Sequence, residues 1–214
     1  MELTKQQIQK VAHYLKSKNL EYVDLQPEVL DHIVTEIEEK MEVEKVTFHN
    51  AFATSKQKWN PQLQETTSMF FGFGFSAPKI VIQKAKKGYL KCYLGLLLSY
   101  FVPFLWLTSN NFIIKNPSEN NYFILVKAVV FLCFASFLFM LFTKKQQKTT
   151  YGFILKAQSF NLFVGLILCI DFMTRISELN GIDIGMLCSF LFSTFSYFNF
   201  YKKHKTVLKK HQIS

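Results

Sequence analysis

Three neighbouring polar residues have the side-chain types best suited to chemistry. They are Asp31, His32 and Glu36, and the last two are four positions apart, so on a helix they would share one face. An imidazole and a carboxylate at this spacing can bind a metal ion or exchange a proton. No second pair of His or Cys residues with ligand spacing completes such a site in the sequence. We therefore expect a polar contact surface here, with no metal and no cofactor.

The sequence also lacks the motifs of the common enzyme classes. It has no G-x-S-x-G, no H-E-x-x-H, no P-loop and no glycine-rich dinucleotide fingerprint. Each long apolar run contains one cysteine, which we interpret as a small hydrophobic residue: Cys92, Cys133, Cys169 and Cys188. We predict that the protein is not an enzyme. A membrane-embedded enzyme is an alternative, and it would need Asp31, His32 or Glu36 for turnover.

Charged residues inside the apolar runs form a second candidate group. Because a charge is costly to bury in a bilayer, such residues usually serve packing or function. Lys127 lies inside the second run, and Asp171 closes the third run at the same predicted side of the membrane. We predict a contact between them that fixes how two helices pack. Asp183 is an alternative partner for Lys127, and snorkelling of Lys127 to the headgroups is another.

The third apolar run is the most polar of the set. Its inner half contains Lys156, Gln158, Ser159 and Asn161. In a membrane such side chains are expected to face other helices, where their hydrogen bonds can be formed. Gln158 and Asn161 could also line a path for a substrate or an ion, so a small transporter or transporter subunit is a second hypothesis. The internal repeats typical of transporters are not evident in the sequence.

Four apolar runs must position these residues. A helix that crosses the bilayer needs about 20 mainly apolar residues, and the sequence offers this length at 88–107, 122–142, 151–170 and 181–201. Lysines gather before the first run, between the second and third, and after the fourth. The positive-inside rule then predicts a multi-pass inner-membrane protein with both termini in the cytoplasm. We expect a four-helix transmembrane bundle over 88–201 and a basic cytoplasmic tail over 202–214.

The first 64 residues differ in charge and pattern. Residues 1–65 carry 8 Lys and 11 acidic residues, a net charge of −3, whereas the rest of the chain has a net charge of +13. A capping box at Thr4–Gln7, a proline at position 27 and an apolar stripe that follows Thr47 indicate three short amphipathic helices. The sequence opens without a signal peptide, so we expect this all-α domain, 1–64, to remain cytoplasmic. We expect its small core to pack against a partner, a second copy of the chain or the membrane surface.

Residues 65–87 connect this domain to the first apolar run. Phenylalanines alternate with glycines there, and a lysine-rich stretch follows: Phe70, Phe71, Phe73 and Phe75, then Lys84, Lys86 and Lys87. Phenylalanine combined with lysine is typical of a segment that lies in the headgroup layer. An ordinary linker is the alternative. Basic clusters beside apolar runs favour anionic lipid as a partner, and direct binding of nucleic acid is not expected.

The front segment resembles a known family. The matching residues are Tyr14-Leu15, Leu30-Asp31-His32-Ile33, Glu36-Ile37-Glu38, Phe48 and Ala51. They are similar to the helix-turn-helix-associated alpha-helical signalling domain, HAAS. In that family a three-helix cytoplasmic module precedes several membrane spans, and the proteins are commonly paired with PadR-type transcriptional regulators. Trp59-Asn60-Pro61, which we expect to end the third helix, replaces the family's Leu-Gly-x-Pro-like turn.

The resemblance implies a membrane-anchored regulator or sensor that works through protein contact and has no catalytic residues. Its partners would be the lipid bilayer and a cytoplasmic protein, such as a transcriptional regulator. The predicted contact surface lies on the second helix of the front domain: Asp31, His32, Glu36, Glu38 and Glu39.

Overall fold

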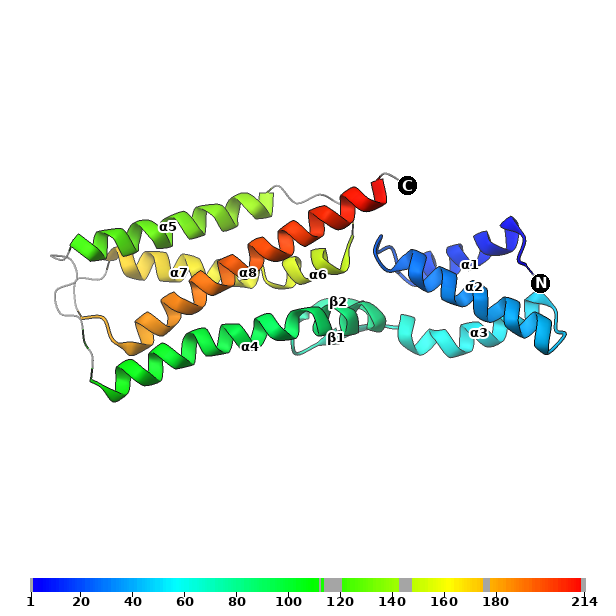
Figure 1. Ribbon diagram of the computed structural model, residues 1–214, viewed down its shortest axis with the longest axis horizontal. Coiled ribbons are helices and arrows are strands. Elements are labelled where there is room, and N and C mark those ends of the chain that lie inside the picture. The colour runs from blue at the N-terminus through cyan, green and yellow to red at the C-terminus, as the bar shows by residue number, and fades with distance from the viewer. Residues whose placement is uncertain (1, 112, 114–120, 143–147, 175–177, 213–214) are drawn as a thin grey trace. The chain divides into compact units, whose positions relative to one another are not determined.

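The computed structural model of the chain is mostly helical, as the sequence predicts (Figure 1). It describes residues 2–111, 113, 121–142, 148–174 and 178–212. The chain divides into two compact units. Unit 1 consists of Met1–Lys87, Gln147–Phe153 and His204–Ser214, and unit 2 of Gly88–Gln146 and Ile154–Lys203.

Unit 1 begins with three helices, α1 (Lys5–Ser17), α2 (Gln26–Val43) and α3 (Phe48–Leu63). Thr4 caps α1, because its side chain accepts from the nitrogen of Gln7 while the Gln7 side chain accepts from the nitrogen of Thr4. Pro27 lies in the first turn of α2, where its missing N–H costs nothing. The expected end of α3 is wrong, because the helix continues through Pro61 for two more residues. A proline in the last turn removes only one hydrogen bond.

The apolar stripes of these three helices form one core. Leu20 and Leu25, in the connection between α1 and α2, are buried together with these helix residues: Val11, Leu15, Val29, Ile33, Ile37, Ala51, Phe52 and Leu63. Rings extend this core at one edge, where Tyr14 packs edge-on against Phe52 with centroids 5.8 Å apart. The Tyr14 hydroxyl donates to Asn60 at 3.0 Å, so α1 and α3 are also joined by a polar contact.

A two-stranded antiparallel hairpin follows, formed by β1 (Glu65–Ser68) and β2 (Gly72–Pro78). Thr66 pairs with Ala77, and the register shifts after Thr67. Gly72 begins β2 with a φ of +89°, a conformation that glycine adopts without strain. These strands were not predicted from the sequence. The alternation of phenylalanine with glycine has the period of two that marks a strand.

Among the described residues, three helices are long and apolar enough to cross a membrane: α4 (Lys79–Ser109), α5 (Asn121–Phe142) and α8 (Gly181–Gln212). The third apolar run differs from the continuous helix expected over 151–170. It forms α6 (Thr150–Ala157) and α7 (Phe160–Thr174), which are separated at Gln158 and Ser159. The Ser159 hydroxyl donates to the carbonyl of Lys156 at 2.6 Å, and its backbone nitrogen bonds the same carbonyl at 3.2 Å. This tight turn takes the place of the regular helical hydrogen bonds.

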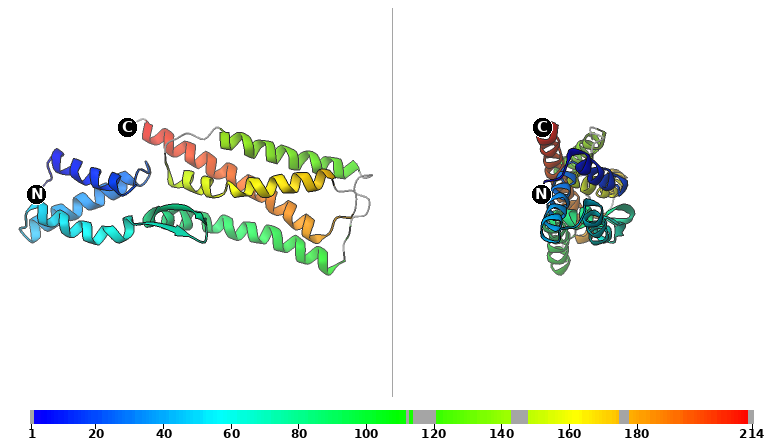
Figure 2. Two further views of the ribbon diagram at one scale, coloured as in Figure 1. Left: turned by 180° about the vertical axis from the view of Figure 1, so that it is seen from behind. Right: turned by 90° about the vertical axis from the view of Figure 1, so that its right-hand side faces the viewer.

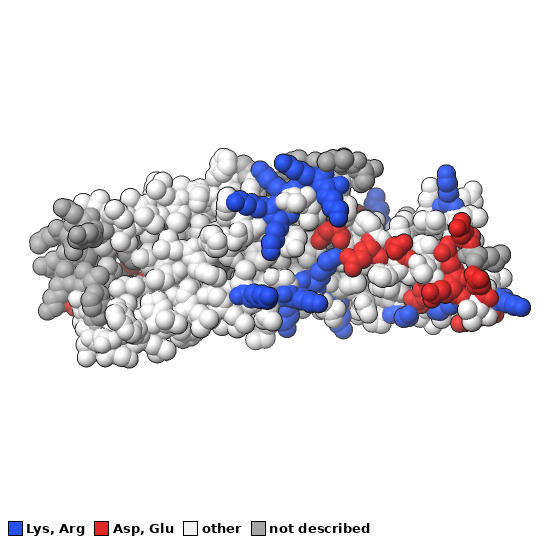
Figure 3. Space-filling model, viewed as in Figure 1, with Lys and Arg blue, Asp and Glu red and all other residues white. Residues whose placement is uncertain are grey.

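Within unit 2, α5 and α7 lie side by side (Figures 1 and 2). Val130 and Leu168 form a buried cluster with Phe190 of α8. Gly165 allows this approach, because a Cβ at that position would lie 2.3 Å from the Phe190 ring. Many large apolar side chains face outward, among them Leu132 with 65% of its surface exposed. On the face shown in Figure 3, the described surface over α5 has almost no charged side chains. This distribution is what a lipid solvent favours.

Candidate functional site

The predicted contact surface on α2 separates into two groups. Asp31, His32 and Glu39 are exposed, whereas Glu36 and Glu38 are half-buried. Glu38 accepts a hydrogen bond from the nitrogen of Leu3 at 2.7 Å, so it holds the segment that precedes α1. Figure 3 shows that acidic side chains gather over the front helices.

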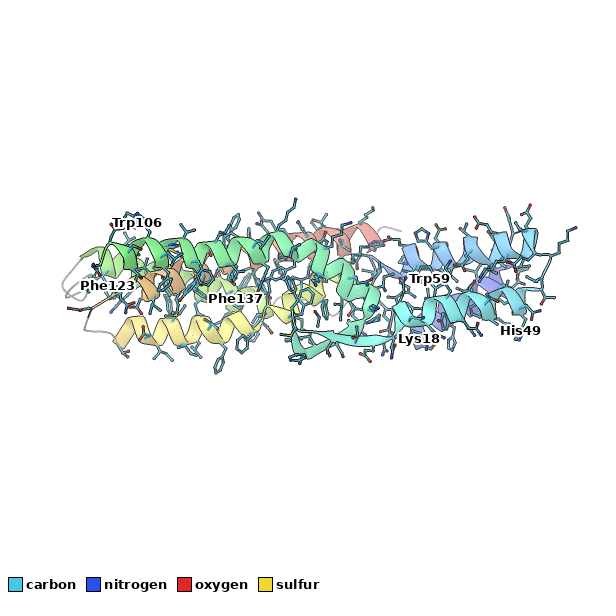
Figure 4. The ribbon with its side chains drawn as sticks, turned by 90° about the horizontal axis from the view of Figure 1, so that it is seen from below. Lys18, His49, Trp59, Trp106, Phe123 and Phe137 are labelled. Carbon is cyan, nitrogen blue, oxygen red and sulfur yellow. The ribbon has the colours of Figure 1, made fainter. Side chains whose placement is uncertain are left out.

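Glu36 joins α2 to α3. Its carboxylate accepts from the Trp59 indole and the Lys58 ammonium, each at 3.0 Å, and from the Ser55 hydroxyl at 3.3 Å. The Lys40 ammonium lies 3.0 Å from the same carboxylate. Trp59 is labelled in Figure 4. Burial alone would raise the pKa of Glu36, but these hydrogen bonds outweigh it and lower the pKa to about 2. Glu36 therefore belongs to the structure of the domain.

The connection between α1 and α2 contacts the start of α6. The nitrogen of Val23 donates to the carbonyl of Lys148 at 3.0 Å. The nitrogen of Thr150 donates to the Asp24 carboxylate at 2.9 Å. The first N–H groups of a helix have no partner inside it, and a carboxylate there is favoured by the helix dipole. Asp24 therefore caps α6 from a distant part of the chain. We use the name cap site for the contacts made here by Val23, Asp24, Lys148 and Thr150, together with the ion pairs Glu21–Lys148 and Glu28–Lys84 and the bond between Thr149 and His204.

Two ion pairs surround this cap. Lys148 lies 2.9 Å from the Glu21 carboxylate, and Lys84 of α4 lies 2.7 Å from that of Glu28. The hydrogen bond and the charge of Lys148 lower the pKa of Glu21. Lys84 also donates to the backbone carbonyl of Asp24 at 3.3 Å. The same short segment of unit 1 is thus held by both α4 and the chain before α6.

A buried polar bond lies behind the cap. Thr149 is fully buried, and its hydroxyl accepts from the nitrogen of Gly152 at 2.8 Å, the usual bond of a helix cap. The same hydroxyl lies 2.7 Å from Nδ1 of His204 on α8. Because the oxygen already accepts one bond, its proton can point to Nδ1 if the imidazole is neutral with its proton on the other nitrogen. This bond ties the end of α8 to the start of α6 inside unit 1.

The chemistry of the cap site is that of a connection between helices. Its groups are capping bonds, ion pairs and one buried imidazole. Across the described ranges, no group of three or more His, Cys, Asp or Glu side chains could hold a metal ion. The arrangement can transmit a displacement of α6, because a shift of that helix start must stretch bonds made by Asp24 and Lys148.

Lys127 and its proposed partners lie in unit 2. The Lys127 ammonium is 4.8 Å from the centroid of the Phe123 ring, labelled in Figure 4, which is a cation–π contact. Asp171 is half-buried on α7. The ion pairs of the described residues do not include one between Lys127 and Asp171. Asn180 caps α8, because its side chain accepts from the nitrogen of Asp183 at 3.2 Å, and the Asp183 carboxylate accepts in return from the nitrogen of Asn180 at 2.9 Å. The packing contact of Lys127 with Asp171 stays a prediction.

Gln158 lies at the break between α6 and α7. Only 5% of its surface is exposed, and its amide lies within interaction range of the Tyr89 hydroxyl of α4. Within the described part of the chain, neither polar atom of this amide completes a hydrogen bond of good geometry. Asn161 belongs to α7, and its side chain lies outside the described residues. Gln158 therefore lies in the turn before α7, and Asn161 lies in the first turn of α7.

Asp24, Thr149 and His204 were not predicted from the sequence as functional residues. A threonine before an apolar run is a known helix-start signal, and it could have indicated Thr149 as a cap. The cap by Asp24 bridges 126 positions, and no local pattern marks it. Comparison of the chain with protein-family models, with curated proteins and with solved structures finds no match.

Proposed function

We propose that this protein is a non-enzymatic regulator or sensor of the membrane, whose cytoplasmic front helices bind another protein and respond to the position of α6. The observation that carries this proposal is the cap of α6 by Asp24. A helix start that is held by a separate domain cannot move without disturbing that domain. Binding of a partner to the front helices and movement of α6 are coupled in this way, and the coupling is reciprocal.

The proposed topology has four spans and places both termini in the cytoplasm of a bacterial-type cell, in its inner membrane. Three spans are α4, α5 and α8, and the fourth is formed by α6 and α7 in succession. Lysines support this orientation, since they gather at the start of α4, at Lys148 before α6 and at the end of α8 (Figure 3). The four-helix transmembrane bundle is part of this proposal.

The proposed partner is a cytoplasmic protein with a basic contact surface. Asp31 and Glu39 are exposed on α2, and His32 lies exposed between them. Opposite charges steer such partners and fix their orientation. The resemblance of the front segment to the HAAS family supports a transcriptional regulator as the partner. A homo-oligomer is compatible with the same small domain.

Charge reversal on the full-length protein tests the partner surface. We expect Asp31→Lys with Glu39→Lys to abolish recovery of the cytoplasmic partner by crosslinking and affinity purification from native membranes. The matched control is Glu2→Lys, an exposed acidic residue before α1. Equal recovery of the same regulator by the wild type and the double variant would refute the contact surface. Deletion of residues 1–64 must also abolish recovery.

A small transporter is the second candidate, because the buried amide of Gln158 at a helix break is a feature of substrate paths. Gln158→Leu separates the two functions. A regulator keeps partner recovery in this variant, whereas a transporter loses flux in proteoliposomes. A membrane-embedded enzyme would instead lose turnover when Asp31, His32 or Glu36 is replaced.

A further inference from the structure

The tip of the β1–β2 hairpin exposes large apolar side chains. Met69 has 83% of its surface exposed, and Phe73 has 73%. Such exposure at the end of a short hairpin is unfavourable in water, because two large side chains remain hydrated. An exposed apolar cluster of this kind usually marks a binding surface.

Neighbouring rings hold this tip in place. Phe71 is buried, and its ring packs edge-on against Phe153 of α6 with centroids 5.3 Å apart. Phe70 packs edge-on against Phe71 at 5.2 Å, and the Lys86 ammonium of α4 lies 5.7 Å from the centroid of the Phe70 ring. The exposed side chains are therefore presented by an anchored turn, between the start of α6 and the lysine-rich part of α4.

Both anchors lie where apolar helix begins. On α4, Lys86 and Lys87 are exposed, and after Lys91 the helix contains no charged residue up to its end at Ser109. On α6, Phe153 lies in the first turn of an apolar helix. If α4 crosses the membrane, the hairpin tip is at the level of the headgroups, because Lys86 touches it.

The charges around the tip favour anionic lipid. No acidic residue occurs between Glu65, at the base of the hairpin, and the end of α4, whereas five lysines do. Apolar side chains flanked by lysines are the composition of segments that bind the headgroup layer of anionic bilayers. A second copy of this tip would repel the first, because both carry the same positive charge.

We propose that residues 69–73 form a lipid-binding site, in which Met69 and Phe73 insert into the headgroup layer of the cytoplasmic leaflet and Lys86 and Lys87 contact the phosphates of anionic phospholipids. The site rests on the membrane topology of the proposed function. Because Phe71 contacts Phe153 one turn after the Asp24 cap, the lipid site and the cap site meet on the same helix.

Photocrosslinking in nanodiscs tests the site with the full-length protein. A p-benzoylphenylalanine residue replaces Phe73, and lipid adducts are measured by mass spectrometry in phosphatidylcholine discs with and without about 30 mol % phosphatidylglycerol. We expect lipid adducts at position 73, at least about threefold more in the anionic discs. The matched control is Val43, which is 81% exposed at the end of α2 and should give no lipid adduct.

Two further variants make the outcome specific. Lys86→Gln with Lys87→Gln should reduce the preference for phosphatidylglycerol to near parity, whereas Lys10→Gln, an exposed lysine of α1, should not change it. The same crosslinker in place of Leu132, exposed on α5, must react with lipid if the helices cross the membrane. If the crosslinker at position 132 reacts with lipid but the crosslinker at position 73 reacts only with protein or not at all, the lipid site is refuted while the membrane topology stands. Failure at 132 would overturn the membrane topology itself.

Discussion

The Asp24 carboxylate accepts a hydrogen bond from the backbone nitrogen of Thr150 at 2.9 Å, across 126 positions of the chain. The residue before a helix usually supplies its cap, and Thr149 does so for α6. Asp24 is a second acceptor for the same helix start, and it lies in the loop between α1 and α2. This loop and the start of α6 must therefore fold together.

Loss of the distant cap should loosen the start of α6. We expect Asp24→Ala to cost about 1 kcal/mol, the usual cost of removing a capping side chain, and to accelerate hydrogen exchange at residues 150–153. Asp24→Asn keeps an acceptor oxygen, so its exchange rate at these residues should lie between those of Asp24→Ala and the wild type. Hydrogen exchange of the full-length protein in nanodiscs measures the effect. Unchanged protection in Asp24→Ala would show that Thr149 alone caps α6.

The buried hydroxyl of Thr149 should be needed for stability. Thr149→Val has nearly the same shape but removes the bonds to Gly152 and His204, so we expect a loss of about 1–3 kcal/mol. Thr149→Ser retains the hydroxyl and should lose much less. Thermal unfolding in detergent, followed by circular dichroism, compares the two variants. Equal melting temperatures would mean that the hydroxyl contributes little.

The Glu36 cluster predicts a dependence on acid. The folded pKa of Glu36 is about 2, below its ordinary value of 4.5, so the charged form stabilises the fold above pH about 4.5. This contribution is lost as the pH falls from about 4.5 to about 2. Glu36→Gln should cost about 1–2 kcal/mol at neutral pH, allowing for partial solvent screening, and should weaken the acid dependence.

Trp59 offers the measurement, because its indole donates directly to Glu36. Its fluorescence should shift to longer wavelength when α2 and α3 separate. Glu39→Gln removes an exposed carboxylate from the same helix and is the control. An identical acid transition in Glu36→Gln and the wild type would contradict the role given to this cluster.

Gly165 should tolerate no side chain. A Cβ at this position would lie 2.3 Å from the ring of Phe190, which is buried, so Gly165→Ala should destabilise unit 2 by about 1–3 kcal/mol. Gly88→Ala is the matched control, because nothing lies within 4 Å of a Cβ there. Alanine favours helix, so Gly88→Ala should be neutral or stabilising. Resistance to heating in detergent ranks the two variants.

Local signals predicted many of the helix starts. Thr4 and Pro27 mark the beginnings of α1 and α2, because capping and the first turn depend on residues a few positions apart. The third helix begins after Thr47, as expected, although the Thr47 side chain makes no capping hydrogen bond. The apolar runs of α4, α5 and α8 were equally clear, since length and composition alone decide them. These properties are written into contiguous stretches of sequence.

Features that depend on distant residues were not predictable in this way. Glu36 has the pattern of a solvated acidic residue, and only the fold brings Lys58 and Trp59 of α3 to it. The Asp24 cap and the Thr149–His204 bond have the same origin. The hairpin and the break at Gln158 were missed for another reason. Both lie in segments whose apolar composition outweighed a short local pattern.

The break at Gln158 and Ser159 makes α6 a short rod of eight residues with its own two ends. Rotation about this point leaves the hydrogen bonds inside α6 and α7 intact, so bending there costs less than bending an unbroken helix. A change in bilayer thickness or lateral pressure would act first at such a joint. If α6 and α7 together form the proposed fourth span, they behave there as a lever with a pivot at Gln158, and the length of α6 sets how far its capped end can move.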